Sequence, residues 1–178
     1  MKIALTGASG FLGCTIARQF AEEGDEVRGL LRPTSRRDHV EHLLSDVVQG
    51  GMNDVQACHS LLDDSDVLVH NAVDWRMLRE GDHQGHLQTN LVRPIELLHE
   101  AGSRGMKIVF VSSVAVHHDM LEQWNGLIDA SHPTRPASLY GAAKASIESH
   151  LWALHAMSST SFAIIRPAAI YGIDPSIE

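Results

Sequence analysis

Cysteine is scarce in this sequence of 178 residues, and no long basic or apolar run is present. Cys14 and Cys58 are the only cysteines and form no C-x-x-C pair, so neither a disulfide framework nor a cysteine-rich zinc site is supported. No apolar stretch approaches the ~20 residues that span a bilayer, and the N-terminus lacks the layout of a signal peptide. We therefore expect a cytoplasmic protein without a membrane partner.

Basic residues are outnumbered, with 14 Lys and Arg against 22 Asp and Glu and a net charge of −8. This balance argues against nucleic acid as a partner. Histidine is frequent, and the sequence contains His83-x-x-His86 and His117-His118-Asp119. Because no third ligand stands at a diagnostic spacing, we interpret these as scattered surface histidines and predict no metal site.

Short apolar runs alternate with helical patterns along the chain. Strands are expected at residues 3–5, 27–31, 47–48, 67–70, 108–112 and 162–165, and helices at 11–23, 39–44, 55–62, 87–103 and 138–157. This alternation predicts a Rossmann-like α/β fold, a doubly wound parallel sheet with helices on both faces and a ligand crevice at the carboxyl ends of the strands. The length suits a single domain over residues 1–178.

Two segments break the pattern. Pro94 lies inside the fourth helical stretch, where it should kink the helix or restart it. Residues 117–136 are polar, contain proline and are too many for a simple connection. We interpret them as a mobile flap over the crevice.

A glycine-rich turn follows the first strand, with the sequence Thr6-Gly7-Ala8-Ser9-Gly10-Phe11-Leu12-Gly13. Gly7 permits a tight turn, Gly10 permits close approach to a pyrophosphate, and Gly13 permits close packing of the following helix. The helix N-terminus supplies N–H groups to the anion. The spacing is G-x-x-G-x-x-G and not G-x-G-x-x-G, so a tight turn that binds nothing is the alternative.

Tyr140 and Lys144 stand four residues apart in the last helical stretch, on one face and ~6 Å apart along the axis. The functional interpretation is that the ammonium lowers the pKa of the phenol, so that Tyr140 exchanges a proton near neutral pH. The alternative is a snorkelling lysine beside a half-buried tyrosine.

Ser112 and Ser113 end the fifth strand, where the crevice should open, and either hydroxyl could polarise a substrate oxygen. The alternative is ordinary turn chemistry. Asn90 is ambiguous in the same way, because it could equally mark a local hydrogen-bonding break.

The ordered combination resembles the extended short-chain dehydrogenases/reductases of the NAD-dependent epimerase/dehydratase family. The motifs that carry the resemblance are the glycine turn, His70-Asn71-Ala72-Val73, Asn90, Ser112-Ser113, Tyr140-x-x-x-Lys144 and Arg166-Pro167. The resemblance implies that Ser113 binds the substrate oxygen, Tyr140 is the general acid/base, and Lys144 holds the nicotinamide ribose and tunes the tyrosine. It also implies a homodimer through the helices at 87–103 and 138–157.

The cofactor residues expected from the motifs and the resemblance are Gly7, Ser9, Gly10, Phe11, Leu12, Gly13, Arg32, Met52, Ala72, Val73, Asn90, Tyr140, Lys144 and Pro167. Relatives that prefer NAD usually carry an aspartate where this chain has Leu31, followed by Arg32. A guanidinium suits a 2′-phosphate, so we expect NADP in preference to NAD. The alternative is that the arginines of this loop are merely solvated.

Other positions depart from the family pattern. Gly50-Gly51-Met52 lacks the acidic residue near the adenine, Val114-Ala115 replaces the acidic pair of 4,6-dehydratases, and Ala169 replaces an asparagine frequent in epimerases. The Arg166-Pro167 form resembles carbonyl, flavonol-type and hydroxysteroid reductases. The family's C-terminal substrate region is largely absent from this sequence.

These observations predict an NAD(P)-dependent oxidoreductase that transfers a hydride between nicotinamide and a small-molecule carbonyl or alcohol carbon. One alternative is a non-catalytic dinucleotide-binding module or sensor. The other is a nucleotide-sugar epimerase.

Overall fold

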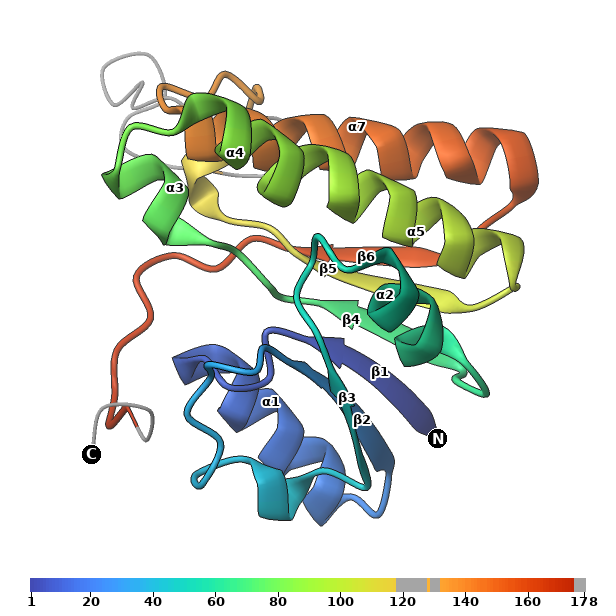
Figure 1. The fold of residues 1–178 in the computed structure, drawn as a ribbon. Helices are drawn as coiled ribbons and strands as arrows, with labels where there is room; N and C mark the ends of the chain where they lie inside the picture. The colour runs from blue at the N-terminus through green and yellow to red at the C-terminus, as the bar shows by residue number, and fades with distance from the viewer. Residues whose placement is uncertain (118–127, 129–131, 175–178) are drawn as a thin grey trace.

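Six parallel strands form one sheet in the computed structural model, which describes residues 1–117, 128 and 132–174. The strands are β1 (Lys2–Thr6), β2 (Glu26–Leu31), β3 (Asp46–Gln49), β4 (Val67–His70), β5 (Lys107–Val111) and β6 (Phe162–Ile165). Their order across the sheet is β3-β2-β1-β4-β5-β6, and every pairing is parallel. The predicted doubly wound α/β fold is confirmed (Figure 1).

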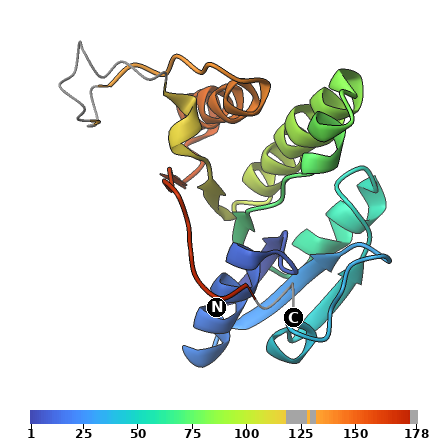
Figure 2. The same ribbon diagram turned by 90° about the vertical axis from the view of Figure 1, so that its left-hand side faces the viewer.

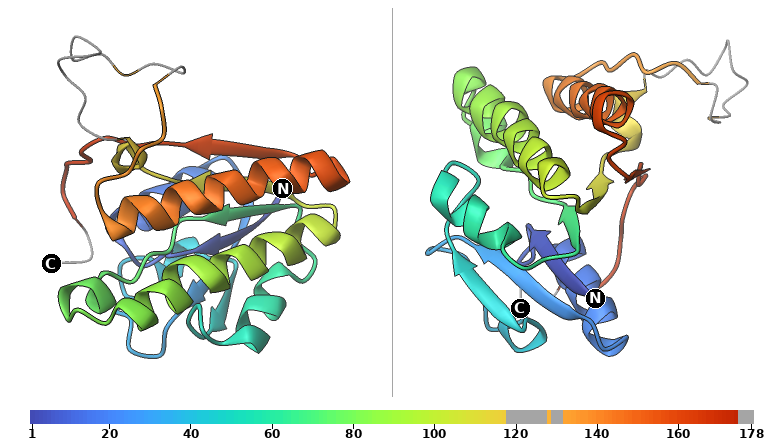
Figure 3. Two further views of the ribbon diagram at one scale, coloured as in Figure 1. Left: turned by 90° about the horizontal axis from the view of Figure 1, so that it is seen from above. Right: turned by 90° about the vertical axis from the view of Figure 1, so that its right-hand side faces the viewer.

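Helices cover both faces of the sheet. On one face lies α1 (Phe11–Glu22), and on the other lie α2 (Val55–Leu62), α5 (Arg93–Ser103) and α7 (Leu139–Ser158), as Figure 3 shows. The core is divided in the same way. One buried cluster includes Phe110 and Leu151, and the cluster toward α1 includes Leu5 and Val27. Burial of these side chains, at about 25 cal/mol per Å² of apolar surface, holds the layers together.

The helical stretch that contains Pro94 restarts, as the sequence predicts. It consists of α4 (His83–Leu87), a π-helical segment η2 (Gln88–Val92) and then α5, with Pro94 at its start. Proline has no N–H to donate to the preceding turn, and a π-helical turn accommodates that gap. Buried Asn90 lies on this segment.

The prediction of a helix at residues 39–44 is wrong over most of that range, because only the 3₁₀ turn η1 (Glu41–Leu43) forms there. Ser45 instead donates its backbone N–H to the Val27 carbonyl at 2.8 Å, so the chain is already extending beside β2. Six residues are too few to hold a helix against such pairing. The short helix α3 (Trp75–Arg79) is an addition that periodicity did not predict.

The crevice of the fold opens where β1 and β4 lie side by side and the strand order reverses. After β6 the chain runs back across this edge of the sheet toward α1 (Figure 2). A Cβ atom placed on Gly172 would lie 3.4 Å from the Phe11 ring, so this segment reaches the start of α1. The proposed flap, residues 117–136, lies largely outside the described residues.

Candidate active site

The glycine turn leaves β1 through a left-handed residue, because Gly7 has φ of +71°. A Cβ atom there would lie 2.9 Å from the Ala72 backbone, so the position also requires the close approach of β1 and β4. A Cβ on Gly13 would lie 1.9 Å from the Gly7 carbonyl oxygen, which ties the first turn of α1 to the loop. Only glycine fits at either place.

The N-terminus of α1 is open toward this loop. Gly10 is the N-cap residue, no side chain caps the helix, and the first turn carries no acidic residue. The unpaired N–H groups and the positive end of the helix dipole therefore remain available to an anion. This cradle fits the pyrophosphate of a dinucleotide.

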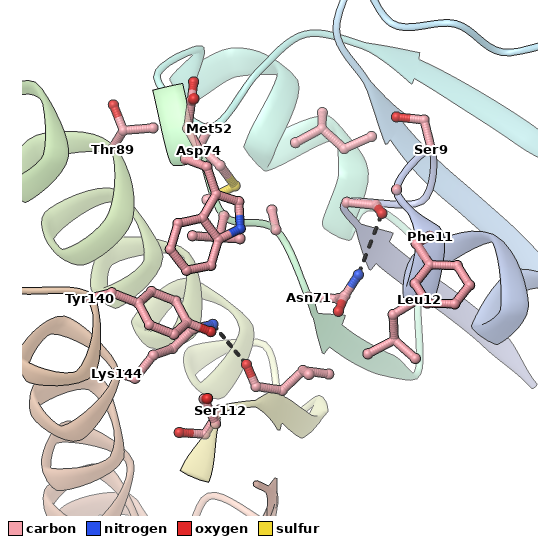
Figure 4. Close-up of a pocket in the computed structure, with 18 of the residues that line it drawn as sticks. Ser9, Phe11, Leu12, Met52, Asn71, Asp74, Thr89, Ser112, Tyr140 and Lys144 are labelled. Atoms are coloured by element: carbon pink, nitrogen blue, oxygen red, sulfur yellow. Dashed lines mark hydrogen bonds between the residues drawn. The ribbon is translucent and has the colours of Figure 1, made fainter. Parts of the chain in front are cut away.

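A side-chain hydrogen bond between Thr6 and His70 joins the carboxyl ends of β1 and β4. Thr6 Oγ1 accepts hydrogen bonds from the backbone N–H groups of Asn71 and Ala72, both at 3.1 Å. Its own proton therefore goes to His70 Nδ1, 2.8 Å away. Burial, with a smaller contribution from Lys144, lowers the pKa of His70 to about 3, so the ring is neutral. Asn71 Nδ2 donates to the Gly7 carbonyl at 3.4 Å (Figure 4).

A pocket of about 480 Å³ lies at the carboxyl ends of the strands and joins the glycine turn to α7. Its lining contains most of the predicted site residues: Gly7, Ser9, Gly10, Phe11, Leu12, Arg32, Met52, Ala72, Val73, Ser113, Tyr140, Lys144 and Pro167. The predicted residues Gly13 and Asn90 are not part of the lining. The lining also contains Asp74, Trp75 and Thr89, which the sequence analysis did not single out. Figure 4 shows that the two ends of the site face one opening.

Tyr140 lies in the first turn of α7 and lines the pocket from there. Ser138 caps this helix by accepting a hydrogen bond from the Gly141 N–H at 3.0 Å. A Cβ on Gly141 would lie 2.1 Å from the Ala115 carbonyl oxygen, so glycine lets the helix approach the loop after β5. Tyr140 and Ser113, from the two elements that meet here, both line the pocket.

The direction of the Tyr140 pKa shift is the reverse of the one expected. Burial raises the pKa of the phenol, and the hydrogen bond with Ser113 offsets this only in part. The Lys144 ammonium lies 5.9 Å from the centre of the Tyr140 ring and donates instead to the Val111 carbonyl at 2.7 Å. The lysine is thus held by the strand, and it does not lower the pKa of the tyrosine in this site.

Lys144 is itself strongly perturbed, with 5% of the residue exposed. Burial lowers the pKa of its ammonium to about 8, and the nearby Glu148 carboxylate partly opposes this. The ammonium also lies 4.7 Å above the centre of the Phe110 ring, a cation–π contact. A charge held at this depth needs these partners, and a snorkelling lysine at a helix edge would not have them.

Behind Lys144, Glu148 is buried and paired with Arg166. Nε and Nη2 of the arginine donate to the two carboxylate oxygens at 3.0 and 2.7 Å. This bidentate geometry explains what the arginine of the Arg166-Pro167 motif does here. It fixes a negative charge one helical turn below the buried ammonium.

Arg32 lies at the end of β2 and lines the pocket, as expected, with 58% of its side chain exposed. Its Nη1 atom lies 3.6 Å from Asp74 Oδ2, and Arg76 Nη2 approaches the same oxygen at 3.3 Å. The arginine is therefore not simply solvated, since it faces a carboxylate on the opposite wall.

Asn90 lies next to the pocket without lining it. Its Oδ1 atom accepts from the Asp74 N–H at 2.7 Å, and its Nδ2 atom donates to the Asp74 carbonyl at 2.9 Å. The side chain thus holds the loop after β4 and influences the pocket only through that loop.

Among residues 1–117, 128 and 132–174, no group of three or more His, Cys, Asp or Glu side chains is placed to hold a metal ion. Within the same part of the chain, none of the helices is long and apolar enough to cross a membrane.

Comparison with curated proteins finds similar sequences over nearly the whole chain. Sterol demethylase protein B of Methylococcus capsulatus is 27% identical over 176 residues, covering 97% of this chain and 52% of that protein. A farnesyl-dihydroquinoline-oxide ketoreductase of Stigmatella aurantiaca is 28% identical over 98% of this chain and 52% of its own length. The chain thus spans about half the length of the curated relatives it matches.

Solved structures show the same fold. A Bordetella bronchiseptica enzyme in complex with NAD+ is 26% identical, with a TM-score of 0.78 over 97% of this chain and 57% of that one. UDP-glucose 4-epimerase of Thermotoga maritima, 19% identical, has a TM-score of 0.82 over 98% of this chain and 57% of its own. The sequence model of the NAD-dependent epimerase/dehydratase family matches residues 3–176. With that match across almost its entire length, the chain belongs to the NAD-dependent epimerase/dehydratase family.

Proposed function

We propose that this chain is an NAD(P)-binding domain over residues 1–178. Its Ser113, Tyr140 and Lys144 catalyse hydride transfer between the nicotinamide and a substrate carbon, so that a small-molecule ketone is reduced or the corresponding alcohol is oxidised. The observation that carries the proposal is that these three side chains share one pocket with the glycine cradle. One of the named relatives, the ketoreductase of Stigmatella aurantiaca, supports it.

A bound reduced nicotinamide supplies the hydride that adds to the carbonyl carbon. Tyr140 gives its phenolic proton to the carbonyl oxygen, so that C=O becomes CH–OH. Ser113 donates a hydrogen bond to the same oxygen and stabilises the negative charge that develops there. Burial raises the pKa of Tyr140, so the phenol keeps the proton that this step transfers.

Lys144 contributes by position and charge. Its ammonium is held at the floor of the pocket by the Val111 carbonyl. Donors that remain on the nitrogen are available to hydroxyl groups of a nicotinamide ribose. Glu148 and Arg166, paired behind it, keep the helix face and the end of β6 in register.

The test compares native protein with Tyr140→Phe in reduced-nicotinamide oxidation over a panel of ketones. Loss of the proton donor should lower the rate by at least about 100-fold. The chain offers a matched control in Tyr171→Phe, because the other tyrosine is 93% exposed and outside the pocket lining. Equal rates for native protein and Tyr140→Phe would remove Tyr140 from the mechanism.

Calorimetry with NADPH and an assay with a UDP-sugar separate the other interpretations. Tight NADPH binding without turnover of any substrate identifies a non-catalytic module or sensor. Turnover of a UDP-sugar with no net change in the nicotinamide identifies an epimerase. Absence of dinucleotide binding overturns all three.

We further propose that NADP is preferred to NAD and that Arg32 binds the 2′-phosphate. Its guanidinium is exposed in the pocket and carries the charge and planar donors that phosphate requires. Loss of such a charged contact costs about 1.5–3 kcal/mol, or at least about tenfold in affinity. Calorimetry should show this loss for NADPH and not for NADH in Arg32→Ala.

Asp74 supplies a second test, because its carboxylate competes for the same guanidinium. Asp74→Asn should retain the N-cap of α3 while freeing Arg32, and should tighten NADPH relative to NADH. Arg37→Ala, which removes an arginine paired with Glu41 in the same loop, is the control. An NADPH-to-NADH affinity ratio unchanged in both Arg32→Ala and Asp74→Asn would refute the preference.

A further inference from the structure

Trp75, the first residue of α3, packs against the ring of Tyr140. The two ring centroids are 4.4 Å apart, the ring planes are tilted by 38°, and both side chains line the pocket. Although Trp75 is large and apolar, 42% of it is exposed. The indole therefore retains accessible aromatic surface beside the phenol, where a planar group could stack.

A continuous set of hydrogen bonds joins the residues that precede the two rings. Asn90 holds the backbone N–H and carbonyl of Asp74, the residue before Trp75, at 2.7 and 2.9 Å. Its Nδ2 atom also donates to His86 Nδ1 at 2.9 Å. His86 Nε2 then donates to the carbonyl of Leu139, the residue before Tyr140, at 3.2 Å.

The donor and acceptor roles in this set are determined by the side-chain chemistry. Asn90 accepts from a backbone N–H through Oδ1, so its NH₂ group must serve the Asp74 carbonyl and His86 Nδ1. His86 consequently carries its hydrogen on Nε2 and donates it to the Leu139 carbonyl. Both side chains are buried and use every polar atom they have. The spacing between the two rings is thus built into the fold.

The charges of the pocket do not favour an anionic substrate. Among the described residues of the lining, the cationic side chains are Arg32 and Lys144. Arg32 faces Asp74, and Lys144 donates to a backbone carbonyl. Because Arg32 is assigned to the cofactor phosphate and the remaining donors of Lys144 to the nicotinamide ribose, no further cationic side chain of the described lining is left for a substrate pyrophosphate.

We propose that Trp75 is a specificity-determining residue that selects planar, apolar carbonyl compounds, of which aryl ketones are the simplest, by stacking their rings beside Tyr140. This inference rests on the proposed function for its turnover test. Asn90 and His86 are positioning residues in it, because their hydrogen bonds hold the residues that precede the indole and the phenol.

The experiment measures NADPH-dependent reduction of 2-acetylnaphthalene and of 2-butanone by native protein, Trp75→Ala and Trp75→Phe. We expect Trp75→Ala to lower kcat/KM for the aryl ketone about tenfold and to change that for 2-butanone less than about twofold. Trp75→Phe, which keeps an aromatic ring, should retain most of the preference of the native protein for the aryl ketone over 2-butanone. Trp152→Ala is the matched control, because this tryptophan is 62% exposed and packs on Phe162 outside the pocket lining.

His86→Leu tests the positioning role. Like Trp75→Ala, it should lower the ratio of kcat/KM for 2-acetylnaphthalene to kcat/KM for 2-butanone, with NADPH affinity unchanged. Thermal unfolding of each variant checks that the fold is retained.

Equilibrium binding of 2-acetylnaphthalene to the NADPH-loaded protein separates the two proposals. If Trp75→Ala turns over both ketones with the same ratio of kcat/KM values as native protein, the specificity role of Trp75 is overturned and the proposed function is retained. Binding that depends on Trp75 without turnover overturns the proposed function and retains the stacking site. Absence of both binding and turnover overturns both.

Discussion

Lys144 should make the stability of this protein depend on pH in a way that one substitution removes. Its ammonium has a pKa lowered from 10.5 to about 8 in the folded protein. Below pH 8 both the folded and unfolded states hold the proton, so the folded state bears the whole cost of burying the charge. Above pH 10.5 both states are neutral, and that cost is absent.

The sign and size follow from proton linkage. Between these two pH values the unfolded state binds more protons than the folded state, so the free energy of unfolding rises with pH. The shift from 10.5 to about 8, at 1.36 kcal/mol per pKa unit, corresponds to ~3 kcal/mol. Lys144→Met removes the titrating group while keeping a side chain of similar length.

The assay is urea unfolding of native protein and Lys144→Met from pH 7 to pH 11. Contributions from other groups cancel in the difference between the two free energies of unfolding. Loss of the hydrogen bond to the Val111 carbonyl, which the neutral amine can also donate, adds an offset that changes little with pH. The cation–π contact with Phe110 belongs to the charged form alone and is lost together with the charge. The advantage of Lys144→Met over native protein should therefore fall by ~3 kcal/mol as pH rises.

Lys107→Met, which removes an exposed ammonium from β5, reports the effect of replacing any lysine. A difference between native protein and Lys144→Met that stays constant across this range would refute the reasoning. It would mean that the buried ammonium is not destabilised relative to the unfolded chain.

Gly13→Ala should lower the free energy of unfolding by on the order of 3 kcal/mol, because its Cβ would lie 1.9 Å from the Gly7 carbonyl oxygen. Gly10→Ala should fold normally, since its Cβ is 3.5 Å from that oxygen, yet bind NADPH at least about tenfold more weakly; equal loss of stability in thermal melts of both variants would contradict this. Glu148→Gln keeps a partner for Arg166 but removes the charge that raises the pKa of the buried lysine. The pH range over which stability rises should then begin below pH 8, and an unchanged range in urea unfolding would count against that electrostatic coupling.

Much of the fold follows from local patterns. Apolar runs and helical periodicity located all six strands to within one or two residues, because burial of one face imposes a period on the chain. The helix expected at residues 39–44 is the exception, since six residues leave the choice to tertiary pairing. Pro94 could be interpreted correctly because its missing N–H acts within the same turn.

The candidate site divides in the same way. Gly7 and Gly13 are recognisable because the positive φ of Gly7 and the contact of Gly13 with the Gly7 carbonyl oxygen are constraints within a few residues. Asp74 and Trp75 directly follow the predicted cofactor residues Ala72 and Val73, but they were missed because the short helix α3, which begins at Trp75, has no periodic signal in the sequence. Asn90 was singled out, but its hydrogen bonds to Asp74 span 16 residues and place it behind the pocket wall.

The sequence by itself therefore determined the doubly wound sheet, the dinucleotide cradle and the presence of Tyr140 and Lys144 on one helical face. The hydrogen bond from Lys144 to the Val111 carbonyl, the raised pKa of Tyr140 and the packing of Trp75 against the Tyr140 ring follow from the tertiary structure alone. Periodicity and glycine geometry act over one or two turns of chain. Burial and charge pairing depend on residues far apart in sequence, and only the packed fold brings those residues together.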